Sequence, residues 1–224
     1  MSRRIAVLRP EPGNAATVAR VTAAGGQAIA LPLFALRPLD WTVPDTADFD
    51  AILLTSANAA RHGGPALAKL TGLPAVAVGE KTAAAARDAG FDVRASGETD
   101  VAAIVAVAGA QGFRRLLHLG GRERSVAVGG PIGAAIAVYA NEALDIDRRA
   151  LAPLAGAVAL LHSARAARRL GELVDSAGMA RGDIALAAIS AAVAGSAGPG
   201  WSATAIATVP RDEMLIDAAL ALID

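Results

Sequence analysis

The sequence predicts an α/β protein with two doubly wound parallel-sheet domains, one of them discontinuous, joined by a two-stranded β-ladder. Three observations lead to this fold class. Short apolar runs alternate with helical stretches, as in parallel sheets that helices cover on both faces. The segment LLTSANAAR (53–61) nearly recurs as LLHSARAAR (160–168). Two long extended stretches, 27–41 and 133–146, separate the regions in which strands and helices alternate.

The first domain begins with the apolar run IAVLR (5–9) and a helix, AATVARVTAAGG (15–26), which Asn14 can cap and the final glycines end. The next stretch, 27–41, contains Pro32 and Pro38. Proline has no N–H to donate to a strand ladder, so this stretch is expected to connect domains rather than form one strand.

The second domain is predicted from strand-like runs that alternate with helices. The expected strands are FDAILLTS (49–56), PAVAVGE (74–80), FDVRAS (91–96) and RRLLHLGG (114–121). The expected helices are EKTAAAARDAG (80–90) and TDVAAIVAVAG (99–109). The extended stretch GAAIAVYANEALDI (133–146) has no helical stop and pairs with the earlier extended stretch in the expected ladder.

The chain then returns to the first domain. Its remaining strands are GAVALLHS (156–163), DIALAAIS (183–190) and SATAIATVP (202–210), and the last helix is RDEMLIDAALALID (211–224), whose acidic start suits the positive end of a helix. The expected boundaries are 1–32 with 149–224 for the first domain, 43–134 for the second, and 33–42 with 135–148 for the ladder.

The near-repeat indicates an internal duplication. A second echo follows each copy, since AVAVGEKTAAAARDAGF (75–91) and ALAAISAAVAGSAGPGW (185–201) share their hydrophobic pattern, a glycine and a final aromatic residue. A single doubly wound sheet without duplication is the alternative, because Ala-rich helices resemble one another by composition alone. The aligned serines at the two strand ends favour duplication.

Composition narrows the function classes. The 224 residues are 54% apolar and contain no cysteine, which rules out disulfides, thiolate nucleophiles and Cys-ligated metal sites. No apolar run has the length of a membrane helix, and the start lacks the apolar region of a signal peptide, so no membrane partner and a cytoplasmic location are expected. Balanced charge, with 21 basic and 21 acidic residues, and only 3% aromatic residues argue against a nucleic-acid partner.

Polar residues at strand-to-helix junctions are the first candidates for a binding site. Ligands of open parallel sheets bind beyond the carboxyl ends of the strands, where helix N-termini attract anions. Ser56 and Ser163 stand at two equivalent junctions, although N-capping alone would also explain either residue. Gly79 and Thr82 in VGEKT offer the same geometry, and Arg124 in GGRERS could clamp a carboxylate or be an ordinary solvated charge.

The histidines and the single tyrosine complete the candidates. His62, His118 and His162 have no metal-ligand spacing, so no metal site is expected. A connector position for Tyr139 would place its phenol between the domains, where it could donate a hydrogen bond or a proton to a ligand. The alternative is an aromatic side chain that only packs against the connector.

Taken in order, LLTSANA, AVGEKTAAAARDAGF, VYANEAL and ISAAVAGSAGPGW, with VLRP at the start, resemble the uroporphyrinogen-III synthase family. The resemblance implies two α/β domains joined by a β-ladder. It also implies cyclisation of the linear tetrapyrrole hydroxymethylbilane, with loss of water and inversion of the last pyrrole ring, by a monomer that needs no metal or organic cofactor. The substrate is a polycarboxylate, because each ring carries acetate and propionate groups.

The resemblance assigns roles to particular positions. Tyr139 matches the tyrosine proposed to assist departure of the hydroxyl group. The positions expected to bind substrate are Arg9, Ser56, Ala57, Asn58, Gly79, Thr82, Arg124, Ser163, Ala164 and Ser190.

Two departures from the family pattern leave other functions open. The segment SAAV keeps Ser190 but lacks the threonines that some members have, and the segment between Arg124 and Tyr139 is shorter than usual. A non-catalytic two-domain module that binds a tetrapyrrole or another polycarboxylate is therefore the alternative function. A phosphate-ligand sensor built on the same helix termini is a third.

Overall fold

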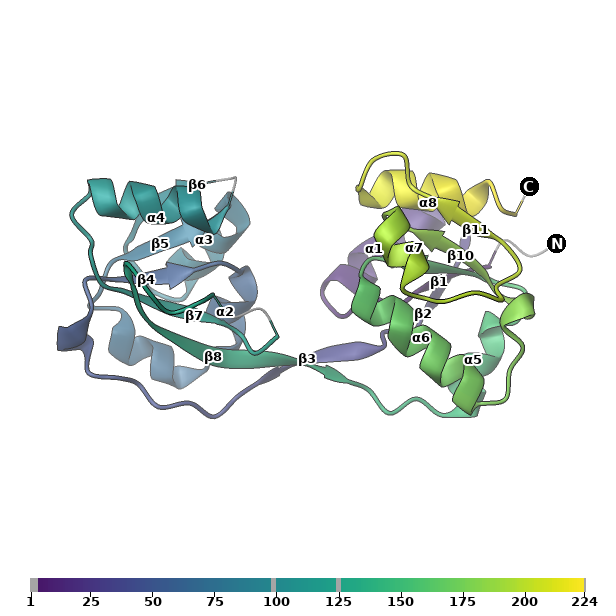
Figure 1. Ribbon diagram of the computed structural model, residues 1–224, viewed down its shortest axis with the longest axis horizontal. Helices are drawn as coiled ribbons and strands as arrows, with labels where there is room; N and C mark the ends of the chain where they lie inside the picture. Colours follow the sequence, from purple (N-terminus) through teal and green to yellow (C-terminus); the bar gives the residue numbers. More distant parts are fainter. Residues whose placement is uncertain (1–3, 98–99, 124–125, 224) are drawn as a thin grey trace. The chain divides into compact units, whose positions relative to one another are not determined.

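The computed structural model describes residues 4–97, 100–123 and 126–223. The chain divides into two compact units. Unit 1 comprises Met1–Ala35 and Ala143–Asp224, and unit 2 comprises Leu36–Glu142. Each unit has its own sheet, with helices on both faces, so the predicted fold class is confirmed (Figure 1). The residue boundaries expected for the domains and the ladder stay predictions.

The sheet of unit 1 has the strand order β11-β10-β9-β1-β2, and all neighbouring strands are parallel. Its central strands are short apolar runs with no exposed residue, as expected for strands that are covered on both faces. The strands are β1 (Arg4–Val7), β2 (Gln27–Ala30), β9 (Val158–Leu161), β10 (Ala185–Ala188) and β11 (Thr204–Ile206).

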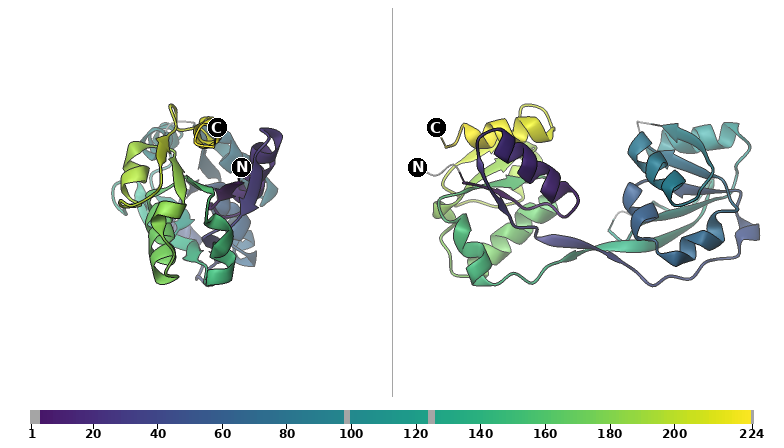
Figure 2. Two further views of the ribbon diagram at one scale, coloured as in Figure 1. Left: turned by 90° about the vertical axis from the view of Figure 1, so that its right-hand side faces the viewer. Right: turned by 180° about the vertical axis from the view of Figure 1, so that it is seen from behind.

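Two helical layers cover this sheet because side chains alternate along each strand. Val7 and Leu160 belong to the apolar cluster beneath α1 (Gly13–Ala23) and α8 (Asp212–Leu220), which lie side by side in Figure 2. Ala6 and Leu161 belong to the opposite cluster, with side chains from α6. The remaining helices of unit 1 are α5 (Arg148–Leu151), α6 (Ala164–Ser176), α7 (Ala191–Gly195) and the 3₁₀ turns η3 (Ala152–Leu154) and η4 (Arg181–Asp183).

The sheet of unit 2 has the order β3-β8-β7-β4-β5-β6. From β8 to β6 every neighbouring pair is parallel. The strands are β3 (Phe34–Pro38), β4 (Ala51–Leu54), β5 (Ala75–Val78), β6 (Val93–Gly97), β7 (Leu116–Gly121) and β8 (Ile132–Ala143).

Strands β3 and β8 form the two-stranded ladder through which the chain leaves unit 1 and returns to it. The Leu39 N–H donates to the Val138 carbonyl at 3.0 Å, and the Leu144 N–H donates to the Leu33 carbonyl at 3.0 Å. The residue number on β8 rises as the residue number on β3 falls, so this pair is antiparallel. The ladder is therefore an antiparallel pair at the edge of an otherwise parallel sheet.

The helices of unit 2 also lie on both faces. Ile52 and Leu54 of β4 pack in the cluster formed with α2, η2 and α3, whereas Leu53 packs with Ile104 of α4 on the other face. The helices are α2 (Ala57–His62), α3 (Glu80–Asp88), α4 (Val101–Ala110) and the 3₁₀ segments η1 (Thr46–Asp48) and η2 (Pro65–Leu70). None of the helices in the described ranges is long and apolar enough to cross a membrane.

The two sheets share one strand order. If β4 is matched with β9 and β5 with β10, as the near-repeat indicates, the orders β8-β7-β4-β5-β6 and β2-β1-β9-β10-β11 coincide. In unit 1 two strands of this order, β1 and β2, come from the start of the chain. This equivalence is what an internal duplication predicts.

The stretch 27–41 differs from the expectation of a connector. Its first part is β2, which pairs with β1 as an edge strand of unit 1, and its second part is β3 of the ladder. Pro32 lies between the two strands, where no ladder N–H is needed. The run therefore divides at the proline, and only its second strand connects the units.

Candidate active site

Ser56 and Ser163 occupy equivalent corners. Ser56 follows β4 and accepts a hydrogen bond from the Asn58 N–H at 3.2 Å, and Ser163 follows β9 and accepts one from the Ala166 N–H at 3.2 Å. The strands that precede these serines, β4 and β9, lie where the strand order of each sheet reverses direction. Open parallel sheets bind ligands at this switch point. Capping uses the acceptor capacity of each hydroxyl and leaves its O–H available to donate.

The residues after each serine provide backbone N–H groups. Ala57 and Asn58 form the first turn of α2, and Ala164 begins α6, which has 13 residues and so presents an extended helix dipole. Ser190 repeats this arrangement after β10, where it accepts a hydrogen bond from the Val193 N–H at 3.3 Å. Thus three predicted binding positions of unit 1, Ser163, Ala164 and Ser190, lie at the carboxyl ends of the adjacent strands β9 and β10.

Gly79 turns the chain from β5 into α3. Its φ of 79° and ψ of 148° form a conformation that only glycine adopts without strain. Thr82 lies in the first turn of α3 and is only 5% exposed. The N-terminus of this 9-residue helix is uncapped by any side chain, so its first N–H groups have no side-chain acceptor within the described residues.

Tyr139 lies on β8 and is 7% exposed. Its ring belongs to the apolar core of unit 2 and packs directly over Gly121, where an added Cβ would lie 2.9 Å from the phenol oxygen. The His62 ring is tilted against it, with the centroids 6.2 Å apart. Within the described residues no group hydrogen-bonds to the phenol hydroxyl. The ring is thus held by packing while its hydroxyl is left uncommitted.

Arg124, the predicted carboxylate clamp, lies outside the described residues. Arg122, two residues earlier, is exposed, and its Nη2 is 3.3 Å from Glu142 Oε1. The backbone N–H of Arg122 donates to the Tyr139 carbonyl at 2.9 Å. Arg122, which directly follows β7, is therefore attached to β8 beside Tyr139.

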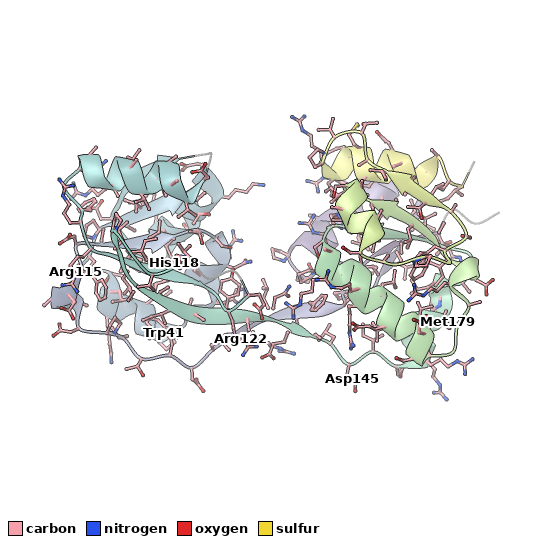
Figure 3. The ribbon with its side chains drawn as sticks, viewed as in Figure 1. Trp41, Arg115, His118, Arg122, Asp145 and Met179 are labelled. Atoms are coloured by element: carbon pink, nitrogen blue, oxygen red, sulfur yellow. The ribbon has the colours of Figure 1, made fainter. Side chains whose placement is uncertain are left out.

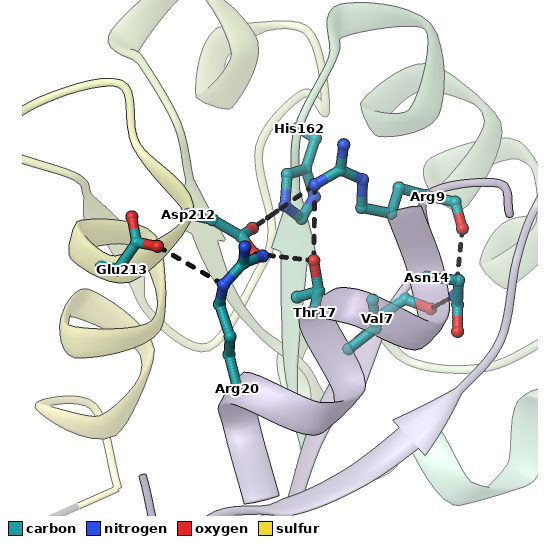
Figure 4. Close-up of polar contacts among 8 residues, drawn as sticks. All are labelled: Val7, Arg9, Asn14, Thr17, Arg20, His162, Asp212 and Glu213. Atoms are coloured by element: carbon teal, nitrogen blue, oxygen red, sulfur yellow. Dashed lines mark hydrogen bonds and ion pairs between the residues drawn. The ribbon is translucent and has the colours of Figure 1, made fainter. Parts of the chain in front are cut away.

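Arg9 follows β1, the strand next to β9, and lies over the first turn of α1 (Figure 4). An added Cβ on Gly13 would lie 2.8 Å from the guanidinium carbon, so the guanidinium packs closely over the backbone of Gly13. Arg9 Nη1 is 3.4 Å from Thr17 Oγ1 and 3.6 Å from Asp212 Oδ1, and about a third of its side chain is exposed. The guanidinium is thus anchored on one side and accessible on the other.

Asp212 is the centre of a polar cluster that sequence analysis missed. Its carboxylate accepts hydrogen bonds from Thr17 at 2.8 Å, Arg20 at 2.7 Å and His162 at 2.7 Å (Figure 4). Burial acts to raise the pKa of Asp212, but the hydrogen bonds from His162, Thr17 and Arg20 and the charge interaction with His162 together lower it. Burial also lowers the pKa of His162, against the effect of its bond to Asp212.

A second pair that the sequence did not reveal lies at the carboxyl edge of unit 2. His118 lies on β7 (Figure 3). It is fully buried, and its Nε2 is 3.0 Å from Thr55 Oγ1. Burial lowers the pKa of His118 to about 4, so its imidazole is neutral at neutral pH.

The described residues contain no group of three or more His, Cys, Asp or Glu side chains that could hold a metal ion. Among the described residues, these edges offer hydroxyls, backbone N–H groups, the guanidinium groups of Arg9 and Arg122, and the phenol of Tyr139. Such groups bind carboxylates and can donate a hydrogen bond to a leaving hydroxyl.

Fold and site together define a two-unit α/β protein with donor-rich sheet edges. The model of the family described as uroporphyrinogen-III synthase HemD matches residues 15–217. The chain therefore belongs to the uroporphyrinogen-III synthase family. This membership makes it a lyase of porphyrin and haem biosynthesis, which cyclises the small-molecule tetrapyrrole hydroxymethylbilane.

A solved structure agrees with the fold. A uroporphyrinogen-III synthetase from Helicobacter pylori is 19% identical, with a TM-score of 0.66, and the match covers 99% of this chain and 100% of that one. A uroporphyrinogen III synthase from Thermus thermophilus is 16% identical with a TM-score of 0.42, covering 99% of this chain and 98% of that one. The search of curated proteins gave no match.

Proposed function

We propose that this chain forms uroporphyrinogen III by binding the acetate and propionate groups of hydroxymethylbilane at the carboxyl edges of its sheets. The predicted binding positions support this, because Ser56, Ser163 and Ser190 all follow parallel strands. Helix N-termini and hydroxyls attract carboxylates without a large net charge, which suits a chain with equal numbers of acidic and basic residues.

The observation that carries the mechanism is the state of Tyr139. Its ring is fixed between Gly121 and the core of unit 2, and its hydroxyl is uncommitted within the described residues. We assign this O–H the role of donating a hydrogen bond to the hydroxyl that leaves the hydroxymethyl carbon as water. The pyrrole nitrogen supplies the electron pair that breaks the C–O bond, and the N–H proton that this nitrogen then loses supplies the second hydrogen of the water, which leaves a neutral azafulvene.

Ring inversion requires positioning more than chemical activation. The azafulvene is reactive by itself, and direct closure of the flexible chain would give the type I isomer. Holding several carboxylates at once restricts the substrate to the conformation in which the last ring is attacked at its substituted carbon, the spiro route. In this proposal the binding residues determine the isomer, and Tyr139 promotes loss of water.

Product analysis tests the function directly. Purified protein is mixed with freshly prepared hydroxymethylbilane, and the oxidised products are separated by chromatography into type I and type III isomers. A predominance of type III is expected. If only the spontaneous type I isomer forms, the proposal is wrong, and tight binding under the same conditions would then indicate a non-catalytic tetrapyrrole-binding module.

A monomeric state, a cytoplasmic location and the absence of a nucleic-acid partner are part of the proposal as well. The family resemblance supports a monomer, and the balanced charge argues against a polyanionic partner. Light scattering coupled to size-exclusion chromatography measures the oligomeric state, and a monomer mass near 22.3 kDa is expected.

A further inference from the structure

Thr55 and His118 form a polar pair that the mechanism above does not use. Thr55 is the residue between β4 and the capping Ser56, and it is partly exposed. His118 lies beneath it on β7 and is 0% exposed. Their only polar contact among the described residues is the 3.0 Å approach of His118 Nε2 to Thr55 Oγ1.

The surroundings of His118 determine which of its nitrogens carries the proton. Nδ1 is buried and has no hydrogen-bond partner in the described part of the chain. A proton on Nδ1 would leave a buried donor without an acceptor, a rare and costly arrangement. With the proton on Nε2, His118 donates to Thr55 and leaves only a bare lone pair at Nδ1. The neutral ring carries one proton, so the Nε2–H form is favoured.

The ring is also fixed in place. An added Cβ on Gly120 would lie 2.5 Å from His118 Cε1, so the imidazole packs directly against this backbone. Because His118 donates to Thr55 Oγ1, the hydroxyl proton of Thr55 must point away from the imidazole. No described residue accepts that proton, and Thr55 is the more exposed member of the pair. The result is an oriented O–H donor at the switch point of the sheet.

We propose that the Thr55 hydroxyl donates a hydrogen bond to a carboxylate of the tetrapyrrole and that His118 is the positioning residue that orients it. This inference rests on the proposed function. Pairing of Leu54 with Leu119 and of Gly121 with Tyr139 puts Thr55 two strands from Tyr139. The two strands are roughly 10 Å apart. Tyr139 lies on the face of Leu54 and Leu119, and Thr55, one residue after Leu54, points to the other face. The carboxylate that Thr55 binds therefore lies on the opposite face of the sheet from Tyr139.

Binding of uroporphyrinogen III, the octacarboxylate product, tests the role of Thr55 without relying on turnover. Thr55→Val keeps the shape of the side chain but removes the hydroxyl, and should raise Kd about tenfold, as expected for the loss of a hydrogen bond to a charged group. Thr55→Ser keeps the hydroxyl and should stay within about twofold of the parent. Thr71→Val is the matched control, because the Thr71 hydroxyl donates to the Ala68 carbonyl at the other end of the sheet, after η2.

Two substitutions test the orienting role of His118. The amide of His118→Gln can place an N–H near the position of Nε2, whereas His118→Leu supplies no donor. Leucine should raise KM about threefold to tenfold with kcat unchanged, and glutamine should recover most of the loss. A purely structural role would affect both variants alike and would appear in their circular dichroism and melting temperatures.

The proposal fails if Thr55→Val binds the product as tightly as Thr71→Val, or if folded His118→Gln is no better than folded His118→Leu. If His118→Leu does not fold, the Thr55 series decides alone, because valine is isosteric with threonine. Formation of only type I product by the parent would refute the proposed function, while the Kd comparison would still decide whether Thr55 binds the carboxylate.

Discussion

Tyr139 combines a buried ring with an uncommitted hydroxyl, so its two contributions can be separated by mutation. In Tyr139→Phe the ring keeps its place over Gly121 and in the core, and the melting temperature should change little. We expect kcat to fall about a hundredfold, at the low end of the range for proton donation, because azafulvene formation is intrinsically easy. Steady-state rates and the isomer ratio are the measurements. Unchanged turnover would remove Tyr139 from the mechanism.

His118 makes stability depend on pH. Its pKa is about 4 in the folded chain and has the ordinary histidine value of 6.5 in the unfolded chain, so between these values the unfolded chain binds more protons than the folded one. Stability is therefore complete above about pH 6.5 and decreases as pH falls to about 4, by about 3 kcal/mol for this group. The lowered pKa of His162 contributes with the same sign.

Urea unfolding at several values from about pH 7.5 to about pH 4.5 measures this dependence. The parent should lose stability steadily below about pH 6.5, and His118→Gln should show a smaller slope because its amide does not titrate. Equal slopes in the two proteins would show that another group is responsible.

At the scale of single elements, helix α8 begins with two acidic residues whose surroundings differ. The side chain of Asp212 is 12% exposed and accepts three hydrogen bonds from other elements, whereas that of Glu213 is 60% exposed and approaches Arg20 at 3.4 Å. Asp212→Asn should lower the free energy of unfolding by about 2 kcal/mol, because bonds to a charged acceptor are lost. Glu213→Gln is the control and should cost about 0.5 kcal/mol or less. Equal losses in urea titrations would contradict this picture.

The cap of α6 allows helix stability and ligand binding to be separated. Ser163→Ala should cost about 1 kcal/mol, whereas Ser163→Gly should cost only a few tenths, since glycine tolerates the cap conformation. If the hydroxyl also binds a carboxylate, the two variants should lose product affinity equally despite their different stabilities. If Ser163→Gly instead binds the product nearly as well as the parent and only Ser163→Ala loses affinity, the role of Ser163 is limited to capping the helix.

The sequence allowed the strands and helices to be predicted where the signal is local. Leu53 and Leu160 lie in continuous apolar runs, and each run ends at a capping serine, so strand and helix could be placed together. For the stretch 27–41, Pro32 and Pro38 predicted an interrupted connector, and the expected boundary at residue 32 put its first part with the first domain, but that this first part forms a strand was not predicted. Sheet membership of β2 depends on pairing with β1, which no local pattern encodes.

The polar clusters could not be predicted because their partners are distant in sequence. Thr17 and Asp212 are separated by 195 positions and Thr55 and His118 by 63, so neither pair forms a motif. The acidic start of α8 was a signal for Asp212, but by itself it indicates only a favourable interaction with the helix dipole. The position of His162 directly before a switch-point serine was the other available signal.

At the scale of the whole molecule, the discontinuous order of unit 1 determines which fragments can fold. Fragment 36–142 contains every parallel strand of its sheet, from β4 to β8, and both of its apolar clusters. We expect it to unfold cooperatively on its own. Fragment 143–224 lacks β1, β2 and α1, so one edge of β9 would be left unpaired, and both apolar clusters of unit 1 would lose the side chains that residues 1–35 contribute.

Fragment 143–224 should therefore be unfolded or aggregated alone, and it should gain cooperative structure when peptide 1–35 is added, because β1 pairs with β9 and α1 packs beside α8. Circular dichroism and urea unfolding of each fragment, with and without the peptide, are the measurements. A scrambled peptide of the same composition is the control, since it keeps the hydrophobicity and loses the pattern. Cooperative folding of 143–224 by itself would mean that β9, β10 and β11 suffice, and that the start of the chain completes the sheet without being needed to form it.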